Sequence, residues 1–129
     1  MKISNWVIYD IEIKVRTILT NIKNVRKHHF GRPYLTAYQL AIVFSQSYPN
    51  EFKSLGYQIG GKNSGKKSSL SQYLARELSG RIKSQEIIDI EGCFISNLHL
   101  DSIILDHNGN KIESSLTHTK DDLSMFRLK

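Results

Sequence analysis

The sequence contains few residues that cross-link or interrupt a chain: one cysteine, two prolines and eight glycines among 129 residues. The lone Cys93 excludes an intramolecular disulfide, and its apolar neighbours favour a small buried hydrophobe at this position. The shortage of proline and glycine argues against a long disordered tract. With 40% hydrophobic residues, a chain of this length can bury one core. We therefore expect a single domain over residues 1–129.

Long hydrophobic runs are also missing. No apolar run approaches the length of a membrane span, and Asp10 and Glu12 interrupt the N-terminal segment before a signal-length run is complete. We therefore expect a cytoplasmic protein without a membrane partner. No nucleophile motif such as G-x-S-x-G is present, and no second cysteine could complete a zinc site. These absences favour a protein that is not an enzyme and that holds no metal or cofactor.

Positive charge is in excess, with a net charge of +6, and it is unevenly distributed. Residues 1–50 and residues 51–83 each carry seven Lys or Arg and two Asp or Glu. Residues 84–129 carry four and eight, respectively. The N-terminal two thirds could therefore face a polyanion. A solvated basic surface with no partner would give the same counts.

The N-terminal segment has a helical repeat of apolar residues, which are spaced alternately three and four positions apart. This spacing predicts a helix over about residues 5–27 that buries one stripe. Two roles stay open for the stripe: it packs into the core of its own chain, or it pairs with a second copy in a homodimer. In the second case, residues 1–35 are a dimerisation element and linker. The stripe consists of Ile8, Ile11, Val15, Ile18, Ile22 and Val25.

Two helical segments are expected next. Thr36 is a good N-cap for a helix over Ala37–Ser47, and Pro49 prevents its continuation. Residues 50–55 are expected to form one or two further helical turns, which Gly56 ends.

A glycine- and lysine-rich loop follows. Residues 60–67 nearly match the phosphate-binding pattern G-x-x-x-x-G-K-[ST], but Lys67 stands where the magnesium-binding hydroxyl belongs. Nucleotide hydrolysis is therefore not expected. Instead, we expect Lys62, Lys66 and Lys67 to contact backbone phosphates, because their charges have no nearby partner and free amides begin the next helix.

That next helix is expected over Leu70–Lys83, with Ser69 as its N-cap. Leucines recur every four residues on one face, and the opposite face is polar without a carboxylate. Arg76 and Gln72 are suited to the edges of guanine and adenine, and Lys83 to a phosphate. The predicted nucleic-acid-binding residues are Lys62, Lys66, Lys67, Ser69, Gln72, Arg76, Ser79 and Lys83.

The sequence becomes typical of β-structure after residue 84. Strands are expected within residues 87–90, 93–95 and 102–106. Asn108-Gly109 is the favoured pair for a two-residue type I′ hairpin turn. Residues 117–129 are expected to form a tail that docks back onto the fold.

This order of elements resembles a winged helix-turn-helix over residues 36–116. In that architecture the later helix enters the major groove and the hairpin touches the DNA backbone. The resemblance implies an α+β fold with a helical N-terminal half and a C-terminal part that contains a β-hairpin. It also implies a duplex-DNA-binding transcription regulator or accessory subunit, with DNA favoured over RNA.

Two other functions stay open. One is a protein-interaction module that docks onto a larger protein through its first helix, with the basic charge serving solubility. The other is a small nuclease built on the hairpin, since histidine and carboxylate side chains can hold a metal beside a general base. Its candidate residues, which do not follow a compact ligand spacing, are His99, Asp106, His107, Asn110 and His118.

Overall fold

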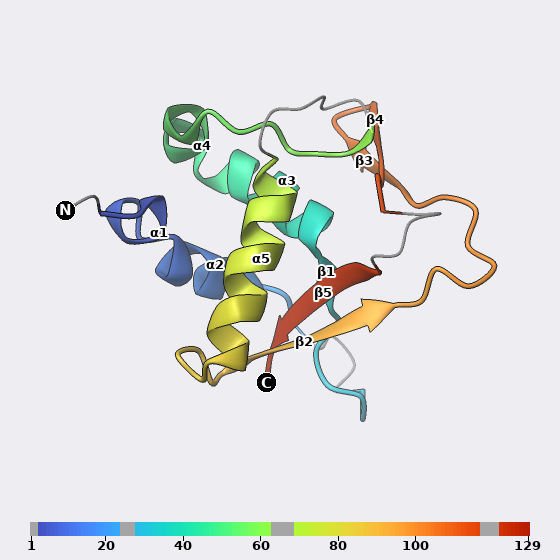
Figure 1. Cartoon of the computed structure of the whole chain (residues 1–129), viewed down its shortest axis with the longest axis horizontal. Coiled ribbons are helices and arrows are strands. Elements are labelled where there is room, and N and C mark those ends of the chain that lie inside the picture. The colour runs from blue at the N-terminus through green and yellow to red at the C-terminus, as the bar shows by residue number, and fades with distance from the viewer. Residues whose placement is uncertain (1–2, 24–27, 63–68, 117–121) are drawn as a thin grey trace.

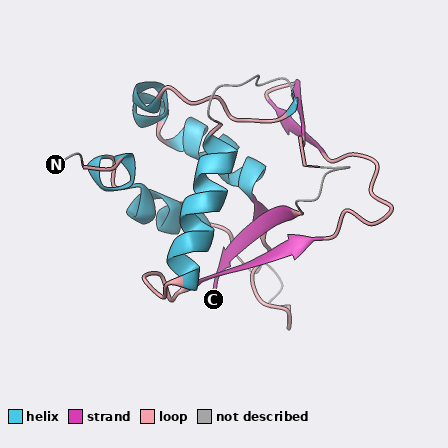
Figure 2. Ribbon diagram, viewed as in Figure 1, coloured by secondary structure: helices cyan, strands magenta, loops and turns pink. Residues whose placement is uncertain are grey.

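A computed structural model of the chain describes residues 3–23, 28–62, 69–116 and 122–129. Within these residues the chain forms five α-helices and five β-strands. The helices gather on one side of the molecule and the strands on the other (Figures 1 and 2). The predicted α+β class is therefore confirmed. No helix in the described part of the chain is both long and apolar enough to span a bilayer.

The N-terminal helix is divided in two. Helix α1 (Asn5–Ile8) and helix α2 (Ile11–Thr20) meet at Asp10, which has a left-handed backbone with φ of 49°. The prediction of one continuous helix over residues 5–27 is therefore wrong, because a left-handed residue cannot continue a right-handed helix. The end of the predicted range, residues 24–27, lies outside the described residues.

The apolar stripe on α2 belongs to the core of its own chain. Ile11 and Val15 have no exposed surface, and Ile18 is 3% exposed. The core alternative is therefore confirmed for these three residues, which are not available to a second copy. The other residues of the stripe differ: Ile8 is exposed, Ile22 is half-buried and Val25 lies outside the described residues.

Helices α3 (Ala37–Ser47) and α4 (Pro49–Leu55) lie where the sequence predicts them. The amide of Gln39 donates to the Thr36 hydroxyl at 3.0 Å, and the Gln39 side chain accepts from the Thr36 amide at 2.7 Å. This reciprocal pair is a capping box, and it satisfies two backbone donors at the helix start. Gly56 ends α4 with φ of 74°, as expected for a left-handed cap.

A three-stranded antiparallel sheet has its strands in the order β1-β5-β2. They are β1 (Leu35–Thr36), β2 (Ile90–Ile95) and β5 (Leu123–Leu128). The predicted tail does dock onto the fold, but as the central strand of this sheet. Within β5 only Leu123 and Phe126 are buried, and this three-residue spacing lacks the alternation by which a strand is identified in a sequence.

The predicted hairpin forms a separate two-stranded sheet from β3 (Ile104–His107) and β4 (Asn110–Glu113). Asn108 and Gly109 connect the strands with φ of 53° and 86°. Positive φ at both central residues is what a type I′ turn requires, so the predicted turn is confirmed.

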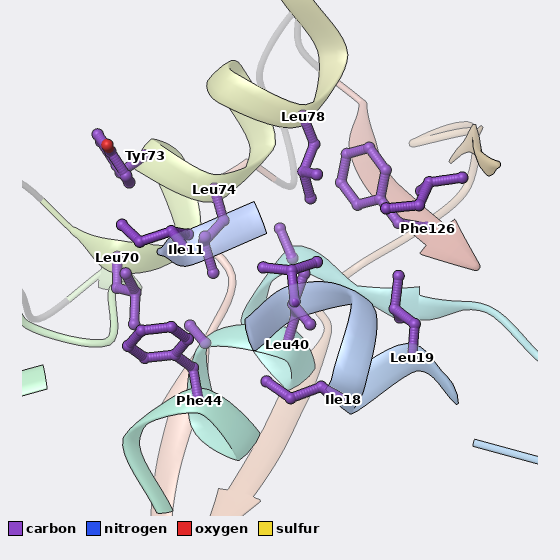
Figure 3. Packing of buried hydrophobic residues seen from close by; sticks show 14 of the residues in the cluster. Ile11, Ile18, Leu19, Leu40, Phe44, Leu70, Tyr73, Leu74, Leu78 and Phe126 are labelled. Atoms are coloured by element: carbon purple, nitrogen blue, oxygen red, sulfur yellow. The ribbon is translucent and has the colours of Figure 1, made fainter. Parts of the chain in front are cut away.

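The core lies where helices α2, α3 and α5 (Leu70–Lys83) meet β5. Figure 3 shows Leu40 and Phe44 of α3 packed below Leu74 and Leu78 of α5, with Phe126 of β5 beside Leu78. None of these five side chains is more than 2% exposed. Their burial fixes the rotation of α5 about its axis, and so decides which of its residues face solvent.

Two glycines allow the chain to pass closely between α5 and the hairpin. A Cβ on Gly60 would lie 2.2 Å from the Ser71 hydroxyl, and one on Gly61 would lie 2.8 Å from the Glu113 carbonyl oxygen. Their φ values are +130° and +103°, which L-amino acids with side chains rarely adopt. Both the space and the backbone therefore require glycine here.

We expect Gly60→Ala to destabilise the fold by roughly 1–3 kcal/mol, through the clash with Ser71 and the strained φ. Gly80→Ala is the matched control. Gly80 lies on the exposed side of α5, and a Cβ there would meet nothing within 4 Å. Because alanine is the better helix former, Gly80→Ala should stabilise by up to about 1 kcal/mol. Urea unfolding followed by circular dichroism measures both; equal effects of the two substitutions would contradict the packing described for Gly60.

The ion pair between Arg16 and Asp89 makes the stability of the fold depend on pH. Arg16 on α2 donates two hydrogen bonds to the Asp89 carboxylate, at 2.7 and 3.0 Å. These bonds lower the pKa of Asp89 below its ordinary value. In the unfolded chain that pKa is about 3.9, so the stabilisation is complete above it and is lost as the pH falls through the lower folded-state value.

Wild type should therefore lose more unfolding free energy than Asp89→Asn as the pH is lowered from about 5 to about 2. Arg16→Gln should flatten the profile equally, and the double variant should flatten it no further, because the two side chains act as one pair. Urea unfolding at each pH measures this. Parallel profiles for wild type and Asp89→Asn would show that the pair does not contribute.

Candidate nucleic-acid interface

Helix α5 lies across the front of the molecule in Figure 1. Its two faces differ as the sequence predicts. Leu70, Leu74 and Leu78 have no exposed surface. The four predicted contact residues on the opposite face, Gln72, Arg76, Ser79 and Lys83, are all exposed. We call these four the polar stripe of α5. The structure therefore brings them together on one accessible surface.

The N-terminus of α5 is not a free anion site. Its first amides already have protein partners: Leu70 donates to the Gln58 carbonyl at 2.6 Å, Ser71 to the Ile59 carbonyl at 3.0 Å, and Gln72 to the Ser69 hydroxyl at 3.1 Å. The prediction that free amides here would hold a phosphate is therefore wrong. Ser69 is buried and caps the helix, so its hydroxyl stabilises α5 rather than facing a ligand.

The cations of the polar stripe are not neutralised. Within the described residues, neither Arg76 nor Lys83 forms an ion pair with a carboxylate. The Arg76 guanidinium lies 5.8 Å from the centre of the Tyr73 ring, a distance at which the ring face attracts a cation. Burial raises the pKa of Tyr73 to about 12, so that ring stays neutral near physiological pH. Arg76 and Lys83 thus keep their positive charge available to an anion.

Arg81, on the flank of α5, has a different role. It donates to Glu77 at 3.1 Å and to Glu86 at 2.7 Å, and its guanidinium lies 4.6 Å from the centre of the Trp6 ring. Glu77 and Arg81 thus form an i,i+4 ion pair along the helix. This arginine joins α5 to α1, and it is not part of the polar stripe.

Two adjoining hollows run between the polar stripe and the sheet. The larger, of about 430 Å³, lies beside Gln72 and Arg76. The smaller, of about 260 Å³, lies beside Ser79 and Lys83. Phe94 of β2 lines both hollows and is 66% exposed. No sequence signal points to this side of the hollows, because it depends on β5 pairing with β2, and β5 gives no strand signal.

The lysine-rich loop is described only in part. Lys62 lies with its Nζ 2.7 Å from the Glu113 carboxylate, so the prediction that the loop charges have no nearby partner is wrong for this residue. Both side chains are partly exposed, and an exposed pair of this kind contributes at most about 1 kcal/mol. A phosphate could therefore replace Glu113. Lys66 and Lys67 lie outside the described residues.

The hairpin contacts the start of α3 and the segment before α5. The Tyr38 hydroxyl accepts from the Ser115 amide at 3.0 Å, just after β4, and Lys62 pairs with Glu113 at the end of that strand. Near the turn, Lys111 pairs with Asp106 at 3.1 Å. The hairpin thus carries little uncompensated positive charge.

The residues considered for a nuclease are not assembled into a metal site in the described part of the chain. Three or more His, Cys, Asp or Glu side chains in a ligand arrangement do not occur there. Asp106 instead bonds to Lys111, which lowers the pKa of this carboxyl. His118 lies outside the described residues.

Comparison of this chain with protein-family models, with curated proteins and with solved structures finds no match.

Proposed function

We propose that this protein binds duplex nucleic acid, DNA rather than RNA, through helix α5, as a winged-helix-like regulator or accessory subunit. The observation that carries the proposal is the polar stripe: four exposed side chains in line on a helix whose other face is buried in the core. Two of the four are cations that form no ion pair with any carboxylate in the described part of the chain. Arginine and glutamine recognise guanine and adenine edges by paired hydrogen bonds, and lysine binds phosphate.

The arrangement of elements supports the same proposal. Helix α3 packs against α5 and precedes it in the chain, as the first helix of a helix-turn-helix precedes the recognition helix. Strands β2 and β5 follow α5. The β3–β4 hairpin lies between them in the chain, where a winged helix has its wing. Two features depart from that pattern: helix α4 and residues 56–69 replace a tight turn, and the β3–β4 hairpin does not belong to the main sheet.

Charge supports the proposal as well. The residues up to Lys83 carry the excess of lysine and arginine, and the acidic residues are concentrated after it. Association with a polyanion through the first part of the chain would release counterions, so binding should weaken steeply with salt.

A second function, docking onto a larger protein through the N-terminal helices, is favoured by one observation. Val7, Ile8 and Ile13 on α1 and α2 are 55–63% exposed. The proposed contact of α5 with nucleic acid does not use this apolar surface. The experiments on the polar stripe decide between the two functions.

Replacing Arg76 tests the proposed contact to a base. We expect Arg76→Ala to weaken binding to a preferred duplex by about 1–3 kcal/mol and to relax preference at one base position. Lys53→Ala is the control, because Lys53 is exposed on α4, away from the stripe. Fluorescence anisotropy measures the binding of both variants, first to a randomised duplex pool and then to sites selected from that pool. Equal weakening on all sequences would make Arg76 a phosphate contact, and no change for Gln72→Ala combined with Arg76→Ala would favour the docking function.

The ion pair between Lys62 and Glu113 allows a substitution that should strengthen binding instead of weakening it. We expect Glu113→Gln to strengthen binding to duplex DNA and to steepen its salt dependence. In this variant Lys62 no longer has to leave the Glu113 carboxylate to reach a phosphate. Lys62→Ala should reduce the salt slope by about one unit. Titration of duplex DNA at several salt concentrations measures the slopes. If neither substitution changes the slope, Lys62 serves only to hold the hairpin.

A further inference from the structure

Phe94 is an aromatic side chain that the fold exposes beside the polar stripe. It is 66% exposed on β2, and it lines both hollows between α5 and the sheet. None of the aromatic ring pairs in the described part of the chain includes it. The contacts proposed above for the polar stripe do not use this ring. Its surface is therefore available to a second ring from a ligand.

The smaller hollow is lined mainly by apolar groups of α5 and the sheet: Ile82, Gly92, Phe94 and Phe126. A Cβ on Gly92 would lie 3.3 Å from the Phe126 ring. Any side chain at that position would therefore fill part of the hollow and crowd the ring. The volume of about 260 Å³ is a little below that of pockets for drug-sized ligands, roughly 300–1,000 Å³. It suits one flat ring system of the size of a nucleic-acid base.

The two cations of the polar stripe lie beside the same hollows. Lys83 lines the smaller hollow and Arg76 the larger. Because they are seven residues apart, they are separated by about 10 Å along the axis of α5. Asp122 also lines the larger hollow, and its Oδ1 accepts from the Asn97 amide at 3.2 Å. Among the described residues, no carboxylate lines the smaller hollow, so an apolar ring and a phosphate can approach it together.

We propose that the smaller hollow holds one unpaired base of the bound DNA, stacked on Phe94, with phosphates of the same strand on Lys83 and Arg76. This inference rests on the proposed function and names its substrate class: duplex DNA that carries unpaired nucleotides beside the duplex. Paired bases present only their edges in the grooves, because neighbouring bases cover their faces. An aromatic side chain therefore stacks on a base that has left the helix.

Charge favours an unpaired nucleotide over an apolar peptide in the smaller hollow. A peptide side chain could fill the apolar space, but it would leave Lys83 and Arg76 without an anionic partner. A nucleotide supplies both the ring and the phosphates. Exposed aromatic rings combined with a positively charged groove are the usual means by which proteins bind single strands.

Fluorescence anisotropy of the full chain with three DNA probes tests the base site. The probes are a blunt duplex, the same duplex with a short single-stranded tail, and the same duplex with an abasic tail of equal length. Both tails carry the same phosphates, so a difference between them comes from the bases. We expect wild type to bind the tail with bases about 5- to 150-fold more tightly than the abasic tail, as stacking on an aromatic side chain allows.

Substitutions of Phe94 assign this preference to its ring. Phe94→Ala should abolish the preference and leave binding to the blunt duplex unchanged, whereas Phe94→Tyr should keep both. Phe30→Ala is the matched control, because Phe30 is 72% exposed but lines neither hollow. It should keep the preference. Circular dichroism confirms that every variant folds.

Stacking also has a direct optical readout. The one tryptophan of the chain, Trp6, is 5% exposed, so the exposed indole of the Phe94→Trp variant reports on the hollow. The tail with bases should quench its emission, and the abasic tail should not. Equal affinity of wild type for the two tails overturns the base site, while binding to the blunt duplex still supports the proposed function. A preference that survives in Phe94→Ala overturns the role of this ring. Binding to the tail with bases but not to the blunt duplex supports the base site and overturns duplex binding, and no binding to any probe overturns both.

Discussion

Burial of the leucine face of α5 is the constraint on which the rest of the structure depends. Leu70, Leu74 and Leu78 are enclosed by α2, α3 and β5. A helix held in this way cannot rotate without exposing these leucines, and exposing even one would cost several kcal/mol, about as much as its removal from a core. The exposed face is therefore equally fixed, which gives the polar stripe a defined orientation before any ligand arrives.

The sequence allowed the helices with strong local signals to be predicted. Thr36 and Ser69 cap α3 and α5 through hydrogen bonds within a few residues, and the Asn108-Gly109 turn depends on its own backbone. Local chemistry of this kind is visible in a single sequence. The break at Asp10 was missed because the apolar spacing continues across it, and periodicity does not register the backbone conformation of one residue.

The candidate site was predicted only where it lies on one helix. The polar stripe follows from the helical period, but its surroundings depend on long-range pairing. The partners of the first α5 amides come from Gln58 and Ile59, and the partner of Lys62 comes from β4. Neither contact has a signature in the sequence, since the groups that meet are backbone atoms or a common pair of charges separated by about fifty residues.

The position of β5 at the centre of the sheet affects how the chain is assembled. In the described part of the chain, strands β1 and β2 are joined only through β5. Until β5 docks between them, the helices can collapse around the leucines of α5, but Phe126 is absent from the core and neither β1 nor β2 has its partner strand. A chain in this state exposes strand edges to other copies of itself, so a delay in the docking of β5 would favour association before folding is complete.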